Sequence, residues 1–262
     1  MDMKRLSVEQ IRSMVAECAP EERDALAQVL LADCRNGVVK LGEKMIRDEQ
    51  KRLKELQRLE NLWVIEDRLH QEGYEVICGC DEVGRGPLAG PVVAAAVLLP
   101  RDAVLYGIND SKKLSEKKRE ELNDMIFEQA IAVGIAEMSP RVIDAINILE
   151  ASRLAMVQAV RNLGVDTDFV VVDGWENPHF LLPQQAVVKG DSKCISIAAA
   201  SIVAKVYRDR LMVKLSEQYP QYGFEKNKGY GTKEHYEALL QYGPCEMHRT
   251  SFNLKLAGNE NE

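Results

Sequence analysis

Two adjacent carboxylates stand where this sequence concentrates most of its potential chemistry. Asp81 and Glu82 follow an apolar run and open a segment rich in glycine and proline, DEVGRGPLAGP at 81–91. Two more acids have a similar setting, because Asp173 follows FVVV and Asp191 follows AVVKG. Acids at the carboxyl ends of strands meet where open α/β sheets place their ligands. Four such oxygen donors suit Mg²⁺ or Mn²⁺, and no histidine or cysteine stands at these positions to favour zinc.

Each acid taken alone has a plainer explanation as a turn former or a helix cap. Successive strand residues also face opposite sides of a sheet, so Asp81 and Glu82 share one site only if the chain bends beside them. Gly79 and Gly84 flank the pair, and glycine permits such a bend. We therefore expect a bend next to this pair.

The segment Gly84–Gly86 and the basic residues around the acids favour a ligand that carries phosphate. Glycine lets the backbone approach a ligand closely, although the segment is not a Walker A sequence. Each basic cluster alone could be a solvated surface, but basic residues interleaved with glycines and aromatic residues are typical of phosphate and sugar contacts. The clusters contain Lys112, Lys113, Lys117, Lys118, Arg119, Lys189, Lys193, Lys226, Lys228, Tyr230, Lys233, His248 and Arg249.

The composition is that of a globular protein with a sizeable core. The chain has 262 residues, of which 46% are hydrophobic and 29% are charged, and its formal net charge is -7. An acidic total excludes histone-like binding, but it does not exclude a local basic face. No apolar run approaches the ~20 residues of a membrane span, and the first ten residues lack the apolar core of a secretory signal.

The 6 cysteines are spread along the chain without a C-x-x-C pair. With no export signal, we expect reduced thiols in a cytoplasmic protein. Cys245 and His248 could serve as two zinc ligands, but no matching second pair accompanies them. A thiol and a histidine packed near the C-terminus are the favoured interpretation.

Residues 1–72 are expected to form a helical domain, which is either an extension of the substrate-binding surface or a packing module without substrate contact. Ser7 and Gln10 have the spacing of a capping box. The segment 40–70 predicts one long charged helix, in which leucines recur every three residues and acids alternate with bases. The pattern changes near 70–74, where we predict the domain boundary.

Residues 73–262 are expected to form an α/β domain with a C-terminal helix and tail. Apolar, β-branched runs predict strands at 75–80, 92–98, 130–138, 169–172 and 185–188. Capping residues predict helices that begin at Ser139, Asn147, Cys194 and Thr232. Strands that alternate with helices favour a sheet with mixed or parallel pairing.

Short motifs in a fixed order resemble those of bacterial ribonuclease HII, a type 2 ribonuclease H. They span about residues 73–256 and read DEVGRGPLAGPV at 81–92, NDSKKLS at 109–115, VDG at 172–174, KGDSK at 189–193, SIAAASIVAKV at 196–206, KGYGT at 228–232 and HRxSF at 248–252. Residues 1–72 resemble, more weakly, the helical extension of some bacterial members. Ribonuclease HIII, the sister type, typically has lysine in the loop where this chain has Arg85, so Arg85 and Pro87 favour type HII.

The resemblance implies a ribonuclease H-like fold, with a mixed central sheet flanked by helices and an N-terminal all-helical domain. It implies an endonuclease that hydrolyses the RNA strand of RNA–DNA hybrids and cuts on the 5′ side of single ribonucleotides in duplex DNA. Two-metal catalysis with Mg²⁺ or Mn²⁺ would leave 3′-hydroxyl and 5′-phosphate ends. The implied catalytic and metal-binding residues are Asp81, Glu82, Asp173 and Asp191.

The resemblance also implies which residues contact the substrate. Gly84, Arg85 and Gly86 match the loop that senses the ribose 2′-hydroxyl, and Tyr230 matches the tyrosine that works with it. Candidate phosphate ligands are Lys112 and Lys193. The expected partners are RNA–DNA hybrids and DNA that contains ribonucleotides, with no membrane and no obligate protein partner.

Two alternatives remain open from the sequence. A non-catalytic protein that binds hybrids would explain the basic clusters but not the four carboxylates. An activity like that of ribonuclease HIII would require runs of ribonucleotides. Nicking of a duplex with one embedded ribonucleotide separates the proposed enzyme from both alternatives.

Overall fold

The computed structural model describes residues 6–19 and 22–256, and the chain divides into two compact units. The units are Met1–Glu60 and Asn61–Glu262. Helix α4 (Val64–Gln71) therefore packs with the second unit, and the domain limit near residue 72 stays a prediction. Among the described residues, no helix combines the length and apolar character that a membrane span needs.

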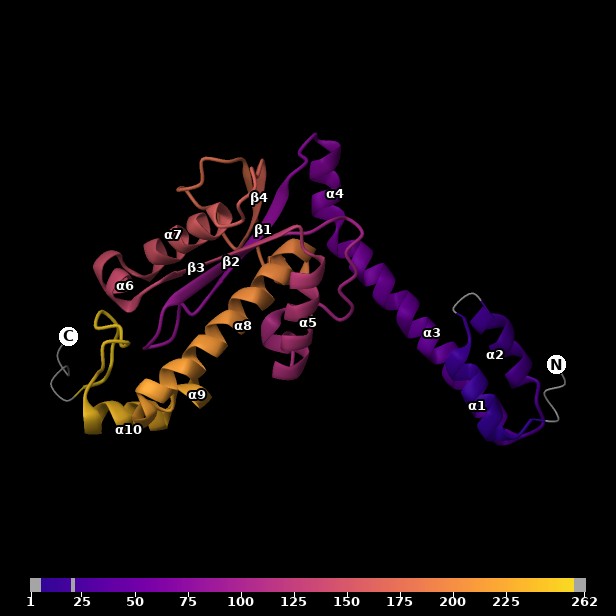
Figure 1. Ribbon diagram of the computed structural model, residues 1–262. Coiled ribbons are helices and arrows are strands. Elements are labelled where there is room, and N and C mark those ends of the chain that lie inside the picture. The colour runs from indigo at the N-terminus through magenta and orange to yellow at the C-terminus, as the bar shows by residue number, and fades with distance from the viewer. Residues whose placement is uncertain (1–5, 20–21, 257–262) are drawn as a thin grey trace. The chain divides into compact units, whose positions relative to one another are not determined.

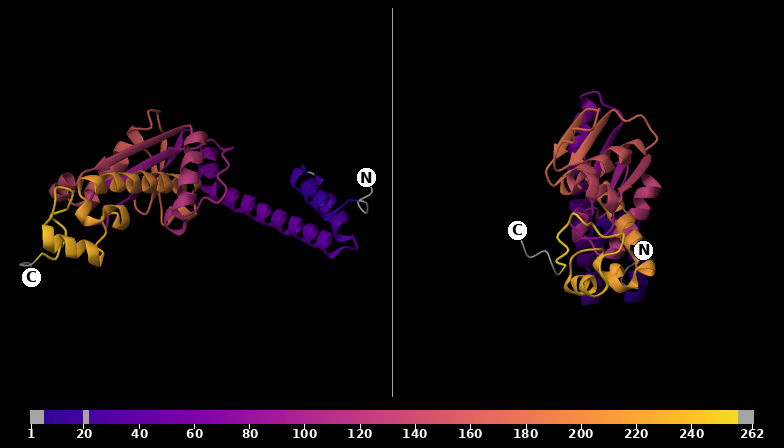
Figure 2. Two further views of the ribbon diagram at one scale, coloured as in Figure 1. Left: turned by 60° about the horizontal axis from the view of Figure 1, so that its bottom comes forward. Right: turned by 90° about the vertical axis from the view of Figure 1, so that its left-hand side faces the viewer.

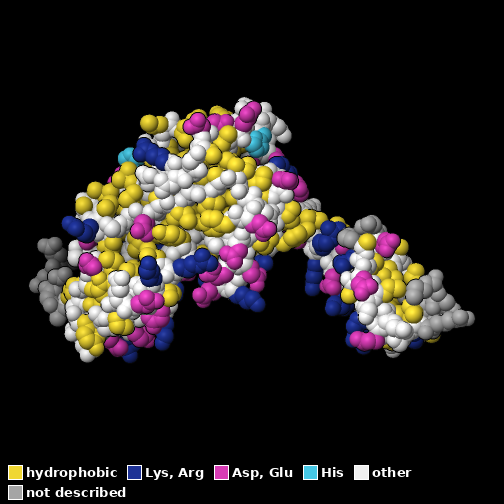
Figure 3. Space-filling view, viewed as in Figure 1, with side chains coloured by type: hydrophobic (Ala, Val, Ile, Leu, Met, Phe, Trp, Pro, Cys, Tyr) yellow, Lys and Arg dark blue, Asp and Glu magenta, His cyan; other side chains and the backbone are white. Residues whose placement is uncertain are grey.

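The first unit is helical, as predicted. It contains α1 (Val8–Glu17), α2 (Arg23–Leu31) and most of α3 (Asn36–Leu62). The capping box is confirmed, because the Gln10 amide donates to Ser7 Oγ at 3.2 Å and the Ser7 amide donates to Gln10 Oε1 at 2.8 Å. Lys and Arg side chains gather along one flank of this unit in the view of Figure 3.

The prediction of one continuous helix over residues 40–70 was wrong. Helix α3 ends at Leu62, and α4 begins after Trp63, which is 3% exposed. The Arg101 guanidinium lies over the Trp63 ring, 5.1 Å from its centroid. The interruption is confined to Trp63, whose φ of -86° and ψ of -9° stay in the right-handed helical region.

The second unit is built on a five-stranded mixed sheet of order β3-β2-β1-β4-β5 (Figure 1). The strands are β1 (Ile77–Val83), β2 (Val92–Leu98), β3 (Ala132–Met138), β4 (Phe169–Asp173) and β5 (Gln184–Val187). β2 is antiparallel to β1 and β3, whereas β4 is parallel to β1 and β5. The predicted mixed sheet is confirmed.

Helices cover both faces of this sheet (Figures 1 and 2). On one face lie α6 (Pro140–Ile146) and α7 (Ile148–Arg161), and on the other lie α5 (Glu116–Gln129) and α8 (Ile195–Gln218). Met156 of α7 packs with Cys80, and Ile197 of α8 packs with Ile77, which faces the opposite way on β1. Shorter helices are η3 (Ser111–Lys113), η4 (Gly190–Ser192), η5 (Pro220–Tyr222), α9 (Phe224–Asn227) and α10 (Lys233–Tyr242).

Helix α8 lies unusually close to the central strand. A Cβ at Gly79 would stand 2.2 Å from the Ser196 carbonyl carbon, so only glycine fits there. The buried Glu66 of α4 fixes the start of the same helix, since its Oε1 accepts from the Ser196 amide at 3.2 Å and the Ser196 hydroxyl at 2.7 Å. Residues of α8 are thereby placed beneath the end of β1.

Candidate active site

The parallel strands bring acids from distant parts of the chain to one edge of the sheet. Cys80 pairs with Val172, so Asp81 and Asp173 are the next residues in register on β1 and β4. Asp191 follows β5 in the short helix η4. This is the carboxyl edge of the parallel strands, where α/β sheets place their ligands.

Asp81 lies under the sheet edge on the α8 side. It is 7% exposed and hydrogen-bonded to Ser201 of α8, and its Oδ1 accepts from the Glu82 amide at 2.7 Å. Burial raises the pKa of Asp81 well above its usual value, and the charges of Glu82 and Asp173 raise it further. A cation bound at this edge would favour the ionised form of Asp81 and offset these effects.

Glu82 belongs to the same strand but faces the other way. β1 continues unbroken through both acids, and Gly84, which directly follows the strand, has a positive φ of 92°. The bend expected beside the pair therefore lies after it, and the two acids still face opposite sides of the sheet. Burial raises the pKa of Glu82, Arg85 opposes that shift at 3.4 Å, and Asp173 adds to it.

A cleft opens on the Glu82 side of the sheet edge. Its volume is about 490 Å³. Glu82 and Asp173 line it together with Arg85, Arg153 and Trp175, whose indole is 80% exposed. The cleft thus combines acids, arginines and an exposed aromatic ring next to the carboxylate edge.

Asp173 and Asp191 are placed by the turn between β5 and α8. The Gly190 amide donates to Asp173 Oδ1 at 2.6 Å, and a Cβ at Gly190 would stand 2.5 Å from Ile197 Cδ1. Burial raises the pKa of Asp191, and the nearby Asp110 and Asp173 raise it further. Asp110, whose charge raises the pKa of the neighbouring Asp191, is a fifth carboxylate, present in one of the sequence motifs but not predicted as a site residue.

The donor set at this edge fits a divalent cation. All of these groups offer carboxylate oxygen, the ligand that Mg²⁺ and Mn²⁺ prefer, and their mutual repulsion would be relieved by positive charge. Within the part of the chain that the structure describes, no three His, Cys, Asp or Glu side chains are already drawn together as metal ligands. Binding an ion would therefore require these side chains to turn toward one another.

Two buried arginines hold the loop that follows β1. Arg208 of α8 donates to the carbonyls of Pro91 at 3.0 Å and Ala89 at 3.2 Å. Arg249 donates to the carbonyls of Gly84 at 2.6 Å and Gly90 at 3.0 Å. Both guanidinium groups are 0% exposed, and burial lowers the pKa of Arg249 to about 9. Sequence reasoning missed the role of Arg208 altogether.

His248 and Arg249 were predicted to belong to the phosphate and sugar contacts. Because both side chains are buried, that prediction is wrong. His248 is 2% exposed and Arg249 is 0% exposed, and their polar atoms contact protein groups. A buried, fully hydrogen-bonded guanidinium cannot reach a phosphate without breaking the loop. The sequence shows a basic pair, but it does not show which way the pair faces.

Tyr230 lies against the same loop. A Cβ placed on Gly86 would stand 3.7 Å from Tyr230 Cε1, and the ring is 43% exposed. The preceding Gly229 carbonyl accepts from the Leu88 amide at 2.8 Å. The structure thus brings Gly86 and Tyr230 together, from segments far apart in the sequence.

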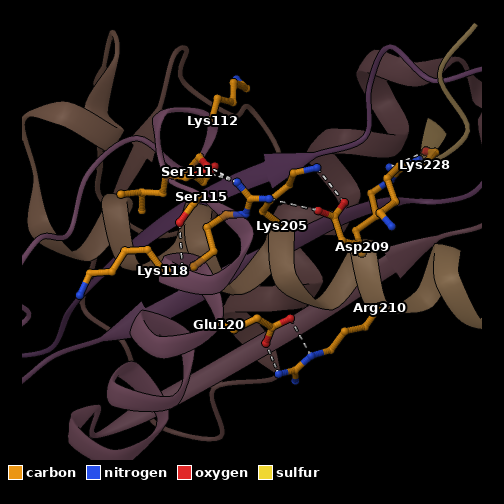
Figure 4. Close-up of polar contacts among 12 residues, drawn as sticks. Ser111, Lys112, Ser115, Lys118, Glu120, Lys205, Asp209, Arg210 and Lys228 are labelled. Atoms are coloured by element: carbon orange, nitrogen blue, oxygen red, sulfur yellow. Dashed lines mark hydrogen bonds and ion pairs between the residues drawn. The ribbon is translucent and has the colours of Figure 1, made fainter. Parts of the chain in front are cut away.

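Other basic residues surround α8 and η3 (Figure 4). Lys205 pairs with Asp209 at 2.7 Å, and Lys112 is exposed and points away from that pair. Lys193 is exposed as well, and its Nζ donates to the Val188 carbonyl at 2.8 Å. Lys112 thus presents its charge to solvent, whereas Lys193 is tied back to its own turn.

Comparison with protein families and curated relatives identifies what this arrangement is similar to. A family model described as Ribonuclease HII matches residues 78–255, and one described as Ribonuclease HII N-terminal domain matches residues 7–70. A Ribonuclease HII of Bacillus cereus is 47% identical over 250 residues, covering 95% of this chain and 96% of the relative. A Ribonuclease HII of Bacillus anthracis is 46% identical over the same length.

Solved structures share the fold of the second unit. The ribonuclease H2 of Pyrococcus horikoshii OT3 is 27% identical with a TM-score of 0.57, covering 69% of this chain and 95% of that one. The RNase HII of Archaeoglobus fulgidus, solved in complex with PCNA, is 28% identical with a TM-score of 0.58, covering 68% and 95%. Bst-RNase HIII in complex with Mn²⁺ is 19% identical with a TM-score of 0.59, covering 71% and 69%, and shows likeness of fold alone.

Proposed function

The chain belongs to the ribonuclease HII family, and from this membership we propose that it cuts duplex DNA on the 5′ side of single embedded ribonucleotides. As a member of this family, the protein is a hydrolase: a divalent-metal-dependent nuclease that cleaves the RNA strand of RNA–DNA hybrids. Incision at a single ribonucleotide, with 3′-hydroxyl and 5′-phosphate ends, is the finer part of the proposal. We also place the protein in the cytoplasm, where its thiols stay reduced.

One observation carries this proposal: the strand that supplies two acids leads directly into the loop that contacts Tyr230. Asp81 and Glu82 end β1, and within the following loop Gly86 lies beside the Tyr230 ring. The 2′-hydroxyl is the group by which a protein distinguishes ribose from deoxyribose. A glycine backbone next to an aromatic ring can approach that hydroxyl closely while the neighbouring phosphate lies at the acids.

In this proposal the acids at the sheet edge hold Mg²⁺ or Mn²⁺. A pair of such ions, when bound, supplies an activated water and stabilises the leaving 3′-oxygen. The protein's own part is to fix the ligands, and the Gly190 amide already orients one carboxylate through its 2.6 Å hydrogen bond to Asp173. The four proposed ligands are Asp81, Glu82, Asp173 and Asp191.

The remaining contacts would fix the position of the substrate. We propose that Tyr230 packs against the sugar of the junction, with the backbone of Gly84 and Gly86 at the 2′-hydroxyl. Lys112, which is exposed beside Asp110, is placed to meet a phosphate. Lys193 can do so only after its 2.8 Å hydrogen bond to Val188 is released, which makes it the weaker phosphate ligand of the two.

The proposal is tested with three matched duplexes that contain no ribonucleotide, one ribonucleotide or four consecutive ribonucleotides. With Mg²⁺ or Mn²⁺ we expect cleavage of the second and third duplexes, no cleavage of the first, and no cleavage of any in EDTA. Cleavage of the third duplex alone would assign a specificity like that of ribonuclease HIII. Binding without cleavage of any duplex would favour the non-catalytic alternative.

A further inference from the structure

A buried pair of histidines connects the C-terminal segment to Tyr230. His235 of α10 is 0% exposed, His248 is 2% exposed, and their Nε2 atoms lie 3.0 Å apart. The Tyr222 ring packs edge-on against His248 at 4.7 Å, and the Phe224 ring packs edge-on against His235 at 5.6 Å. Burial lowers the pKa of both histidines, that of His248 to about 4. Near neutral pH each ring is therefore uncharged and carries one proton.

The neighbouring groups fix where these two protons lie. The Cys245 amide can only donate, and it donates to His248 Nδ1 at 3.0 Å. The His248 proton therefore lies on Nε2 and is donated to Nε2 of His235. The proton of His235 must then lie on Nδ1, where it is donated to the Tyr230 carbonyl at 2.8 Å. Each donor in the chain thus meets an acceptor.

The same contacts favour the interpretation that Cys245 and His248 are a packed thiol and histidine, and not a pair of zinc ligands. The Cys245 thiol lies 3.3 Å from His248 Nδ1, but that nitrogen already accepts from the Cys245 amide. Among the described residues, Cys245 and His248 do not belong to any group of three potential metal ligands.

We propose that His235 and His248 are positioning residues, which hold the Tyr230 backbone so that its ring stays against Gly86 at the RNA–DNA junction. This inference rests on the proposed function of Tyr230. The residue is fixed from both sides, because the Gly229 carbonyl accepts from Leu88 while the Tyr230 carbonyl accepts from His235. Removing the second contact frees one side of the peptide while the buried arginines keep the loop in place.

Acid breaks this chain of hydrogen bonds. A second proton on His235 would place two N–H groups face to face across the 3.0 Å contact between the rings. A second proton on His248 would place its Nδ1–H against the Cys245 amide N–H, which is also 3.0 Å away. Among the described groups packed against the pair, the titratable ones are Tyr222 and Cys245. Arg249 follows in sequence, but its guanidinium points into the loop, where it donates to the Gly84 carbonyl. None of these three groups offers a negative carboxylate to compensate the added charge.

The proton positions are tested directly by ¹⁵N NMR of histidine-labelled wild-type protein. The chain has 4 histidines, and the exposed pair is assigned through His70→Gln and His179→Gln. We expect His248 as the neutral Nε2–H form and His235 as the neutral Nδ1–H form between about pH 7 and pH 8, above the ordinary pKa of histidine. The reversed forms, or a charged ring in that range, would overturn the inference without bearing on the proposed function.

The functional role is tested by two variants that differ in the atom they retain. His235→Asn keeps an amide donor near the Nδ1 position, whereas His235→Gln keeps an amide group only near Nε2. For His235→Gln we expect a single-turnover rate about tenfold lower on the single-ribonucleotide duplex, because displaced groups align poorly. The Kd for hybrid should stay within about twofold, because phosphate contacts dominate affinity. His235→Asn should lose much less rate, and thermal melts check that both variants fold.

Equal rate losses in the two folded variants would overturn the positioning role. Tyr230→Ala, measured beside them, separates the two levels of the account. If Tyr230→Ala is impaired and the histidine variants do not differ, the inference fails while the proposed function stands. If Tyr230→Ala cleaves at the wild-type rate, the proposed function of Tyr230 fails.

Discussion

A single substitution of Asp173 tests the proposed metal chemistry. Asp173 stands level with Asp81 across two parallel strands and accepts the Gly190 amide at 2.6 Å. Asp173→Asn keeps an oxygen for that hydrogen bond but removes a negative charge from the proposed metal site. We predict that kcat falls by at least about 100-fold with hybrid binding kept, since such ions act as Lewis acids worth several kcal/mol. Single-turnover cleavage and gel shifts measure the two effects.

Asp166→Asn is a matched control for this prediction. Asp166 is an exposed acid just before the amino end of the same strand, so the substitution removes the same charge away from the sheet edge. We expect it to cleave normally. Near-normal turnover by a folded Asp173→Asn protein would contradict the assignment of the carboxylate site.

Tyr230 should influence the rate of cleavage at a single ribonucleotide more than the affinity for the substrate. Its ring is 43% exposed beside Gly86, so it can contact a sugar without refolding of the loop. For Tyr230→Ala we predict a loss of about 10- to 100-fold in cleavage at a single ribonucleotide, because a misplaced scissile phosphate is costly. Hybrid affinity should change little, because phosphate contacts supply most of it. Tyr230→Phe separates the roles: a mild effect assigns packing, and a severe effect assigns hydrogen bonding by the hydroxyl.

Sequence reasoning found acids by their type and neighbours, but it could not find contacts between distant segments. Asp110 belongs to a recognised motif, yet its proximity to Asp191 joins segments that only the fold brings together. From the sequence, Arg208 and Arg249 would be expected to be exposed to solvent. The structure shows instead that both are buried and donate hydrogen bonds to backbone carbonyls. Buried arginines are rare enough that exposure is the natural expectation.

At the scale of elements, the loop after β1 depends on Gly84 for both its conformation and its packing. Its φ is 92°, and a Cβ there would stand 2.3 Å from Arg208 Nε and 2.9 Å from the Pro91 carbonyl oxygen. We predict that Gly84→Ala displaces Arg208, loosens the loop and lowers cleavage by about tenfold or more, since small misplacements at a site are costly. Single-turnover cleavage measures that loss.

Gly73→Ala is the control, because Gly73 has a φ of 99° but an added Cβ would meet nothing within 4 Å. Both variants bear the backbone strain of about 1–3 kcal/mol in free energy of unfolding. Only Gly84→Ala should lose activity at temperatures where both are folded. Equal activity of the two would mean that the contact with Arg208 does not support the loop.

Elements with a strong local signal were predictable, and those set by tertiary packing were not. The strand at 92–98 was placed at its observed limits, since a run of VVAAAVL is apolar and β-branched. The strand at 75–80 was placed too early, because the pairing with β2 continues through the polar Asp81 and Glu82. Helix α5 was missed, since its sequence EKKREELNDMIFEQ buries only Leu122, Asn123 and Ile126 and has little apolar periodicity.

For the whole molecule, the open question is what the first helical unit contributes. The exposed basic residues of α3 include Lys40, Lys44, Arg47, Lys51 and Lys54. We predict that removing residues 1–60 weakens hybrid binding and flattens its salt dependence by roughly one unit for each phosphate that the unit binds, while cleavage chemistry persists. Binding titrations over a range of salt concentrations measure both effects.

A full-length chain with those five residues changed to glutamine separates loss of charge from loss of the unit. It should show the same flattened slope as the truncated chain. An unchanged Kd and slope in a folded truncation would mean that the unit packs without touching substrate.

The point of truncation matters. Deleting residues 1–72 would also remove Trp63 and Glu66, and Glu66 Oε1 accepts from Ser196 and from the Cys194 thiol at 3.0 Å. Those buried donors would be left without an acceptor at the start of α8, at a cost of about 1–3 kcal/mol each. A shorter deletion that keeps Asn61–Glu262 preserves them, so it tests substrate binding without damaging the site.

The central claim is that the carboxylate edge and the Gly84–Gly86 loop together direct a cut to the 5′ side of a ribonucleotide. The most direct test is to map the products from an end-labelled DNA duplex with one ribonucleotide, cut by wild-type protein in Mg²⁺. We predict one cut, with a 3′-hydroxyl on the upstream DNA and a 5′-phosphate on the ribonucleotide. A cut on the 3′ side, cyclic phosphate ends, or no cut while longer RNA runs are cleaved would contradict it.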